Sequence, residues 1–265
     1  MEWACAMTTA STSQVRLLII SLVGLLFVSW SATIFLMGGV HANHSNQIDP
    51  FISYLISWII MMTAMMLPAE IRFALVFHQF SSGSNKKKLA DLFTWFFLVG
   101  YFLVWATFGA IAYWMDVEIS SFSLDLSLSD QQKSVLAGAI IVVSGLYQLS
   151  SMKQSCLIHC TSPIPFFFRK WKSGMLAAVK LGIEHGVVCV GCCWGLMLIL
   201  LALGSMDLFW MSVMGLIMFA EKIFAWMHWF TKPLAVGLIV LGVWVGFSPS
   251  TEYPFHLASH SLHTP

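Results

Sequence analysis

The chain has 265 residues, of which 58% are hydrophobic and only 9% carry a formal charge, too few to cover a water-soluble surface of this size. Its 12 tryptophans and 21 phenylalanines fit the aromatic enrichment of membrane interfaces. A formal net charge of +1 without a long basic tract gives no reason to expect nucleic-acid binding.

The composition and the apolar runs together predict an all-α, polytopic transmembrane helix bundle, formed as one integral membrane domain over residues 1–265 and surrounded by lipid. A helix needs roughly 20 apolar residues to cross the hydrocarbon core. The last apolar run is short, so both six and seven spans remain open. The expected spans are residues 17–39, 51–68 (with the helix possible beyond Pro68), 92–115, 134–151, 173–204, 207–230 and 233–247.

The charges between these spans predict the orientation of the chain. Lys86, Lys87 and Lys88 follow the second span, whereas residues 41–50 contain no lysine or arginine. Residues 116–133 contain a single lysine among several acidic side chains. Because lysine and arginine are enriched in cytoplasmic loops, we expect a cytoplasmic N-terminus.

The fifth predicted span holds half of the six cysteines of the chain, at Cys189, Cys192 and Cys193. Residues four apart share one side of a helix. His185, Cys189, Cys193 and Met197 should therefore form one stripe, with Cys192 beside it. Thiolate, thioether and imidazole groups are preferred by soft metals such as Cu(I). The alternative is that these cysteines pack as small hydrophobic side chains.

A second cysteine motif follows the fourth span, where Cys156 and Cys160 flank His159. If this segment is helical or re-entrant, its cysteines can face those of the fifth span. The spacing completes no standard zinc-finger pattern. A cytosolic face keeps thiols reduced, which favours metal or redox chemistry over structural disulfides.

Methionines are numerous, and Met65 and Met66 lie in the second span at helical spacing from Met61 and Met62. Such a stripe is often plain packing. Thioethers remain neutral, however, so Met65 and Met66 are candidate lining residues for a Cu(I) path.

Charged residues within the predicted spans are the third candidate feature. We expect Glu184 and His185 on the fifth span to meet Glu221 and Lys222 on the sixth, because antiparallel helices joined by a short turn pack along their length. The alternative is an ion pair that only joins two helices. Residues 248–265 form a histidine-containing C-terminal tail, either an outer metal site or incidental.

Several of these segments resemble a family of bacterial and archaeal integral membrane proteins described as predicted metal-binding. The most specific are MMTAMMLP at residues 61–68 and CVGCCWGLM at residues 189–197. The resemblance extends from Trp58 to Lys222 and leaves out the first span, the last span and the tail. It implies metal binding in a prokaryotic cytoplasmic membrane without naming the metal or a reaction.

The sequence therefore favours a membrane protein that binds a soft metal, most simply copper, for transport, storage or delivery. Its expected partners are a membrane protein complex or a soluble metal carrier. Two alternatives remain open. One is an accessory or structural subunit of a larger membrane enzyme complex. The other is a redox enzyme that works through Cys189 and Cys192, although the pair lacks thioredoxin-like context.

Overall fold

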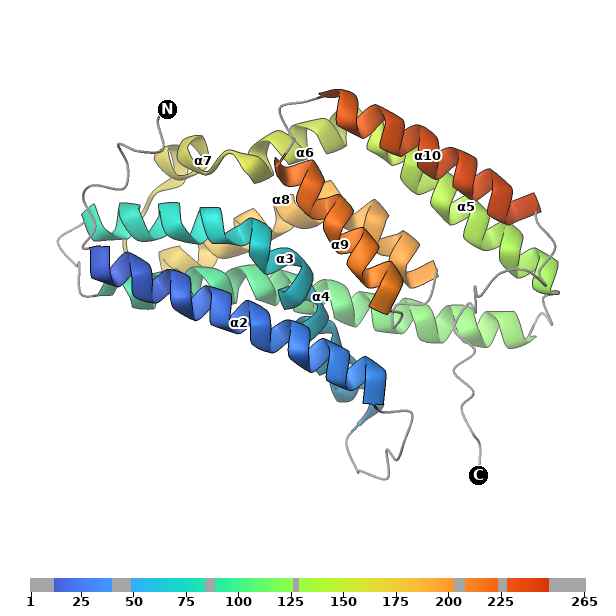
Figure 1. Cartoon of the computed structure of the whole chain (residues 1–265), viewed down its shortest axis with the longest axis horizontal. Coiled ribbons are helices and arrows are strands. Elements are labelled where there is room, and N and C mark those ends of the chain that lie inside the picture. The colour runs from blue at the N-terminus through green and yellow to red at the C-terminus, as the bar shows by residue number, and fades with distance from the viewer. Residues whose placement is uncertain are drawn as a thin grey trace. The chain divides into compact units, whose positions relative to one another are not determined.

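The computed structural model describes residues 12–39, 49–83, 89–125, 129–202, 208–223 and 228–247, and the regular elements in these ranges are α-helices (Figure 1). The all-α fold class is confirmed. The histidine tail and Lys86, Lys87 and Lys88 lie outside the described residues. The helices are α2 (Thr12–Gly39), α3 (Pro50–Gly83), α4 (Ala90–Asp125), α5 (Asp130–Gln148), α6 (Ser151–Thr161), α7 (Pro163–Lys170), α8 (Met175–Ala202), α9 (Leu208–Ile223) and α10 (His228–Phe247).

Four of the described helices are long and apolar enough to cross a membrane. They contain Val15–Phe35, Pro50–Ser82, Ala90–Met115 and Met175–Leu201. A fifth candidate is the pair Ser134–Gln148 and Ser151–Thr161, which is bent by 67° and fits either a broken span or a re-entrant segment. The expected sixth span includes residues outside the described ranges, so a total of six or seven remains a prediction, as does the orientation.

Helix α3 continues without interruption through Pro68 and reaches 34 residues. Proline inside a helix removes one backbone hydrogen bond, which destabilises the helix locally. The helix nevertheless extends beyond Pro68, where the second span was expected to end. The continuation carries Glu70 inside an apolar helix, where its side chain is 1% exposed.

Contacts divide the chain into two compact units, and the first comprises Met1–Gly109 and Cys156–Gly191. Within it α2 lies along α3 (Figure 1), and the Ser29 hydroxyl donates a 2.8 Å hydrogen bond to the Ile60 carbonyl. Aromatic side chains fill its core, and the rings of Phe77 and Phe97 stack with centroids 4.9 Å apart. Helices α4 and α8 approach closely at Gly182. A Cβ at this position would collide with the Phe97 carbonyl oxygen, so only glycine allows the approach.

The second unit comprises Ala110–Ser155 and Cys192–Pro265. Its helices α5 and α10 lie side by side (Figure 1). Gly138 and Gly242 allow this approach, since a Cβ on Gly242 would lie 2.7 Å from the Gly138 carbonyl oxygen. Small residues at a helix contact are typical of membrane proteins, where packing and not the hydrophobic effect drives association.

Candidate metal centre

Helix α8 carries the expected stripe of soft ligand groups. It is unbroken from Met175 to Ala202, so residues separated by three or four positions lie one turn apart. The five side chains of the stripe are at most 2% exposed. They are His185, Cys189, Cys192, Cys193 and Met197.

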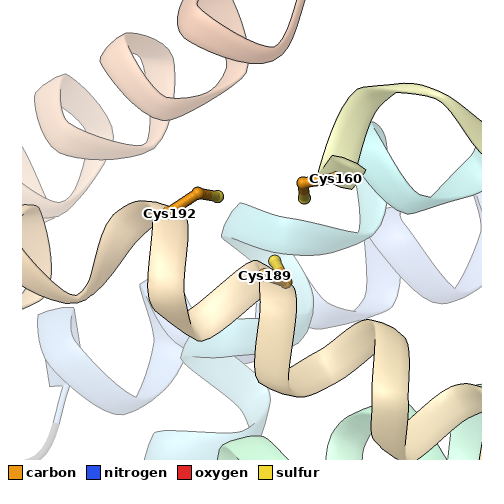
Figure 2. A group of neighbouring side chains, drawn as sticks. All are labelled: Cys160, Cys189 and Cys192. Carbon is orange, nitrogen blue, oxygen red and sulfur yellow. The ribbon is translucent and has the colours of Figure 1, made fainter. Parts of the chain in front are cut away.

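Cys160 on α6 lies close to two cysteines of α8, Cys189 and Cys192 (Figure 2). The sulfur atoms of Cys160, Cys189 and Cys192 lie within 4.8 Å of one another, and all three side chains are buried. The division into units passes through α8 immediately before Cys192. Because α8 is continuous there, helix geometry places Cys192 one turn after Cys189.

Local sequence explains the position of Cys160. Helix α6 begins after a short break that follows α5, and it ends at Thr161. Pro163 then occupies the first turn of α7, where its missing N–H has no helical partner to lose. Cys160 thus lies in the last turn of an 11-residue helix whose end is set by the sequence Ser-Pro.

The spacing of the three sulfurs suits one shared ion. A metal–thiolate bond is about 2.3 Å long, so two sulfurs on one ion are at most about 4.6 Å apart. Three sulfurs spaced evenly around one ion are about 4.0 Å apart, so small side-chain rotations within the 4.8 Å limit bring the group onto one ion. None of the cysteines of the described residues forms a disulfide, so their sulfurs are available as ligands.

A tyrosine hydroxyl lies beside this group. The Tyr101 oxygen is 3.2 Å from the Cys189 sulfur, and both side chains are fully buried. A cysteine binds metal as a thiolate, which must be stabilised where water is excluded. The Tyr101 hydroxyl can donate a hydrogen bond to that thiolate.

A second group of potential ligands contains Glu70, Cys160 and His185, whose ligand atoms also lie within 4.8 Å of one another. His185 Nε2 is 2.8 Å from a carboxylate oxygen of Glu70. The Phe73 ring stacks on the imidazole with centroids 3.8 Å apart. Glu70 is not among the site residues predicted from the sequence. A carboxylate in an apolar helix is costly in a membrane, and that cost is the signal that could have identified it.

The remaining cysteines of the expected site are not part of either group. The Cys156 sulfur faces α8 at Gly191, where an added Cβ would lie 3.2 Å from it. Cys193 is buried on α8 and follows Cys192 in the sequence. The thioether residues Met65, Met66 and Met197 are at most 3% exposed, and their roles as ligands remain predictions.

The expected partner of Glu221 is wrong. Glu221 was expected to pair with the fifth-span residues, but its carboxylate oxygens lie 2.7 and 2.8 Å from Lys153 Nζ. The Gln148 side chain also accepts a hydrogen bond from Lys153. Lys222, the neighbour of Glu221, is 7% exposed.

Glu184 was likewise expected to meet the sixth span, and it instead forms a 2.6 Å ion pair with Lys170. The reason is that α6 and α7 lie between residues 151 and 170, most of which fall between the predicted spans. Helix α6 brings Lys153 to Glu221, and α7 brings Lys170 to Glu184.

The described chain therefore has the features of a helical metal-handling protein, namely long apolar helices and buried thiol ligands. The model of the PpoB2 family, described as a copper chaperone, matches residues 55–245, and the chain belongs to this family. No curated protein and no solved structure matches the chain. The match includes Glu70 and the three clustered cysteines, and it continues into α10, beyond the limit expected from the resemblance. Family and cysteine cluster together fit copper binding.

Proposed function

We propose that this protein is a membrane-embedded copper chaperone that holds Cu(I) between Cys160, Cys189 and Cys192 and delivers it to an acceptor protein. The supporting observation is the three-cysteine group itself. Its sulfurs lie within 4.8 Å of one another and come from two helices, α6 and α8.

The ligand type favours Cu(I) over other ions. Thiolates are soft donors and select Cu(I), whereas oxygen ligands select hard ions. Structural zinc is almost always held by four protein ligands, and this group offers three sulfurs. In this proposal Met65, Met66 and Met197 are thioether contacts on the path of the ion, and the predicted ligands Cys156, Cys193 and His185 are not among the three that bind it.

Composition and helix length support membrane embedding. Four described helices are long and apolar enough to cross the bilayer, and 58% of the residues are hydrophobic. A buried thiolate site in such a bundle keeps Cu(I) away from water and oxidants. Delivery then requires a partner that offers competing ligands, either a soluble carrier or a subunit of a membrane complex.

The test is a Cu(I) titration of detergent-purified protein against a chromogenic Cu(I) chelator. We expect the native protein to retain Cu(I), and we expect the Cys189→Ser/Cys192→Ser variant to lose the tight site. Cys193→Ser is the matched control, because Cys193 is equally buried on the same helix. Equal Cu(I) retention by the native protein and the double variant would overturn the proposal.

A second measurement separates the alternatives. X-ray absorption of the copper-loaded protein should show sulfur as the main ligand of Cu(I). Thiols that cycle between reduced and disulfide forms in protein that binds no copper would instead support the redox enzyme. Folded protein that neither binds copper nor cycles its thiols would support a structural subunit.

A further inference from the structure

Cys160 belongs to both ligand groups. Its sulfur lies within 4.8 Å of the sulfurs of Cys189 and Cys192, and within the same distance of ligand atoms of Glu70 and His185. A thiolate sulfur has more than one lone pair and can bridge two soft ions. The two groups can therefore be two neighbouring ion positions with one ligand in common.

His185 has the arrangement of a metal ligand supported by a carboxylate. Its Nε2 faces Glu70 at 2.8 Å. Its Nδ1 is buried and has no hydrogen-bond partner among the described residues. Buried polar atoms are normally paired. Metal-bound histidines usually donate their other ring N–H to a carboxylate or carbonyl. Glu70 fills that role here and leaves Nδ1 for an ion.

Aromatic rings fix the orientation of this imidazole. Phe73 stacks on it at 3.8 Å between centroids, with an angle of 25° between the ring planes. Phe166 and Tyr101 lie at 5.7 Å, the first edge-on and the second stacked. Packing on several sides restricts rotation of His185, which stays fully buried.

We propose that Cys160 and His185, with Glu70 as the orienting carboxylate, form a second Cu(I) position through which copper enters or leaves the three-cysteine site. This inference rests on the proposed function. The transfer is a ligand exchange without a change of oxidation state. The bonds from copper to Cys189 and Cys192 break in turn as a bond to His185 forms, and Cys160 remains bound throughout.

The position should hold copper less tightly than the three cysteines do, because an imidazole replaces thiolates. A weaker position next to a tight one suits release to an acceptor. We therefore expect the native protein to bind two Cu(I) ions. The first should be bound by sulfur alone, and nitrogen should appear in the X-ray absorption spectrum only with the second.

The decisive variant is His185→Asn, with His78→Asn as its control. His78 is also fully buried, and its Nε2 also lies 2.9 Å from a carboxylate, that of Asp91. No cysteine of the described residues forms a ligand group with it. We expect His185→Asn to bind one Cu(I) and to release it more slowly to the chelator. His78→Asn should bind two ions and release them at the native rate.

Glu70 provides a second variant pair. Gln keeps an oxygen that can accept the His185 N–H, so Glu70→Gln should bind both ions. Glu70→Ala should lower the affinity of the second ion about tenfold to a hundredfold, as loss of a supporting carboxylate does elsewhere.

Two failures can be told apart. If the Cys189→Ser/Cys192→Ser variant loses the tight ion but His185→Asn still binds two, this inference is overturned and the proposed function stands. If neither the native protein nor any variant binds Cu(I), the proposed function itself is overturned. Absence of nitrogen from the spectrum of native protein loaded with two ions would also overturn the inference, without relying on any variant.

Discussion

The Nζ atom of Lys153 lies 2.7 Å from a carboxylate oxygen of Glu221, and the two side chains are 2% and 3% exposed. The pair joins α6 to α9. Removing one partner of a buried ion pair leaves an uncompensated charge, which typically costs about 3–5 kcal/mol of stability.

Glu221→Gln should therefore lower the thermal unfolding temperature of the detergent-purified protein strongly. Copper content, measured below that temperature, should stay native, because neither residue belongs to a ligand group. Replacing both partners, as in Lys153→Met/Glu221→Leu, should recover much of the lost stability. If Glu221→Gln instead unfolds normally but loses copper, the pair belongs to the metal path.

The two cysteines of α6 should differ in their effect on copper binding. Cys160→Ser removes a sulfur from the three-cysteine group and should weaken retention of the first Cu(I) in the chelator titration. Cys156→Ser removes a sulfur that faces Gly191 outside the group and should leave retention of that ion unchanged. The reverse ranking would mean that α6 presents its other cysteine to the ion.

Tyr101→Phe should weaken copper retention without removing a ligand. The hydroxyl lies 3.2 Å from the Cys189 sulfur, and its loss removes one hydrogen bond to the thiolate. Such a bond contributes about 0.5–1.5 kcal/mol, which corresponds to roughly a twofold to tenfold change in Cu(I) affinity. Tyr54→Phe also removes a buried hydroxyl and serves as the control. Equal affinities for the two variants would contradict the prediction.

Gly182→Ala should destabilise the protein. In an exposed helix interior this change usually stabilises by up to about 1 kcal/mol. At Gly182 the added Cβ collides with the Phe97 backbone oxygen, so α4 and α8 must separate, at a typical cost of about 1–3 kcal/mol. Gly24→Ala is the control, because nothing lies within 4 Å of a Cβ there. Denaturation curves with the opposite ranking would show that the two helices can separate freely.

The apolar pattern was sufficient to predict the long helices. Hydrophobic runs and helical spacing place Cys189 and Cys192 on α8, because those signals are local. The helical continuation beyond Pro68 was open from sequence alone. A proline signals a break, and only packing along the whole of α3 offsets the lost hydrogen bond.

The partners of buried polar groups could not be predicted in the same way. Glu70 and His185 are 115 positions apart, and no local pattern links them. Lys153 and Lys170 fall between the predicted spans, because the short helices α6 and α7 lack the apolar length of a span. Ion pairing depends on how such segments fold back, which is a tertiary property.

Cys160 on α6 and Cys189 on α8 are separated along the chain by α7 and the start of α8. An ion held by both would act as a removable cross-link, closing a loop of the chain much as a disulfide does. Copper binding would then make the protein more rigid, because the ion would hold α6 against α8 more firmly than packing alone does. An acceptor that contacts α6 or α7 could sense whether copper is present before it offers its own ligands.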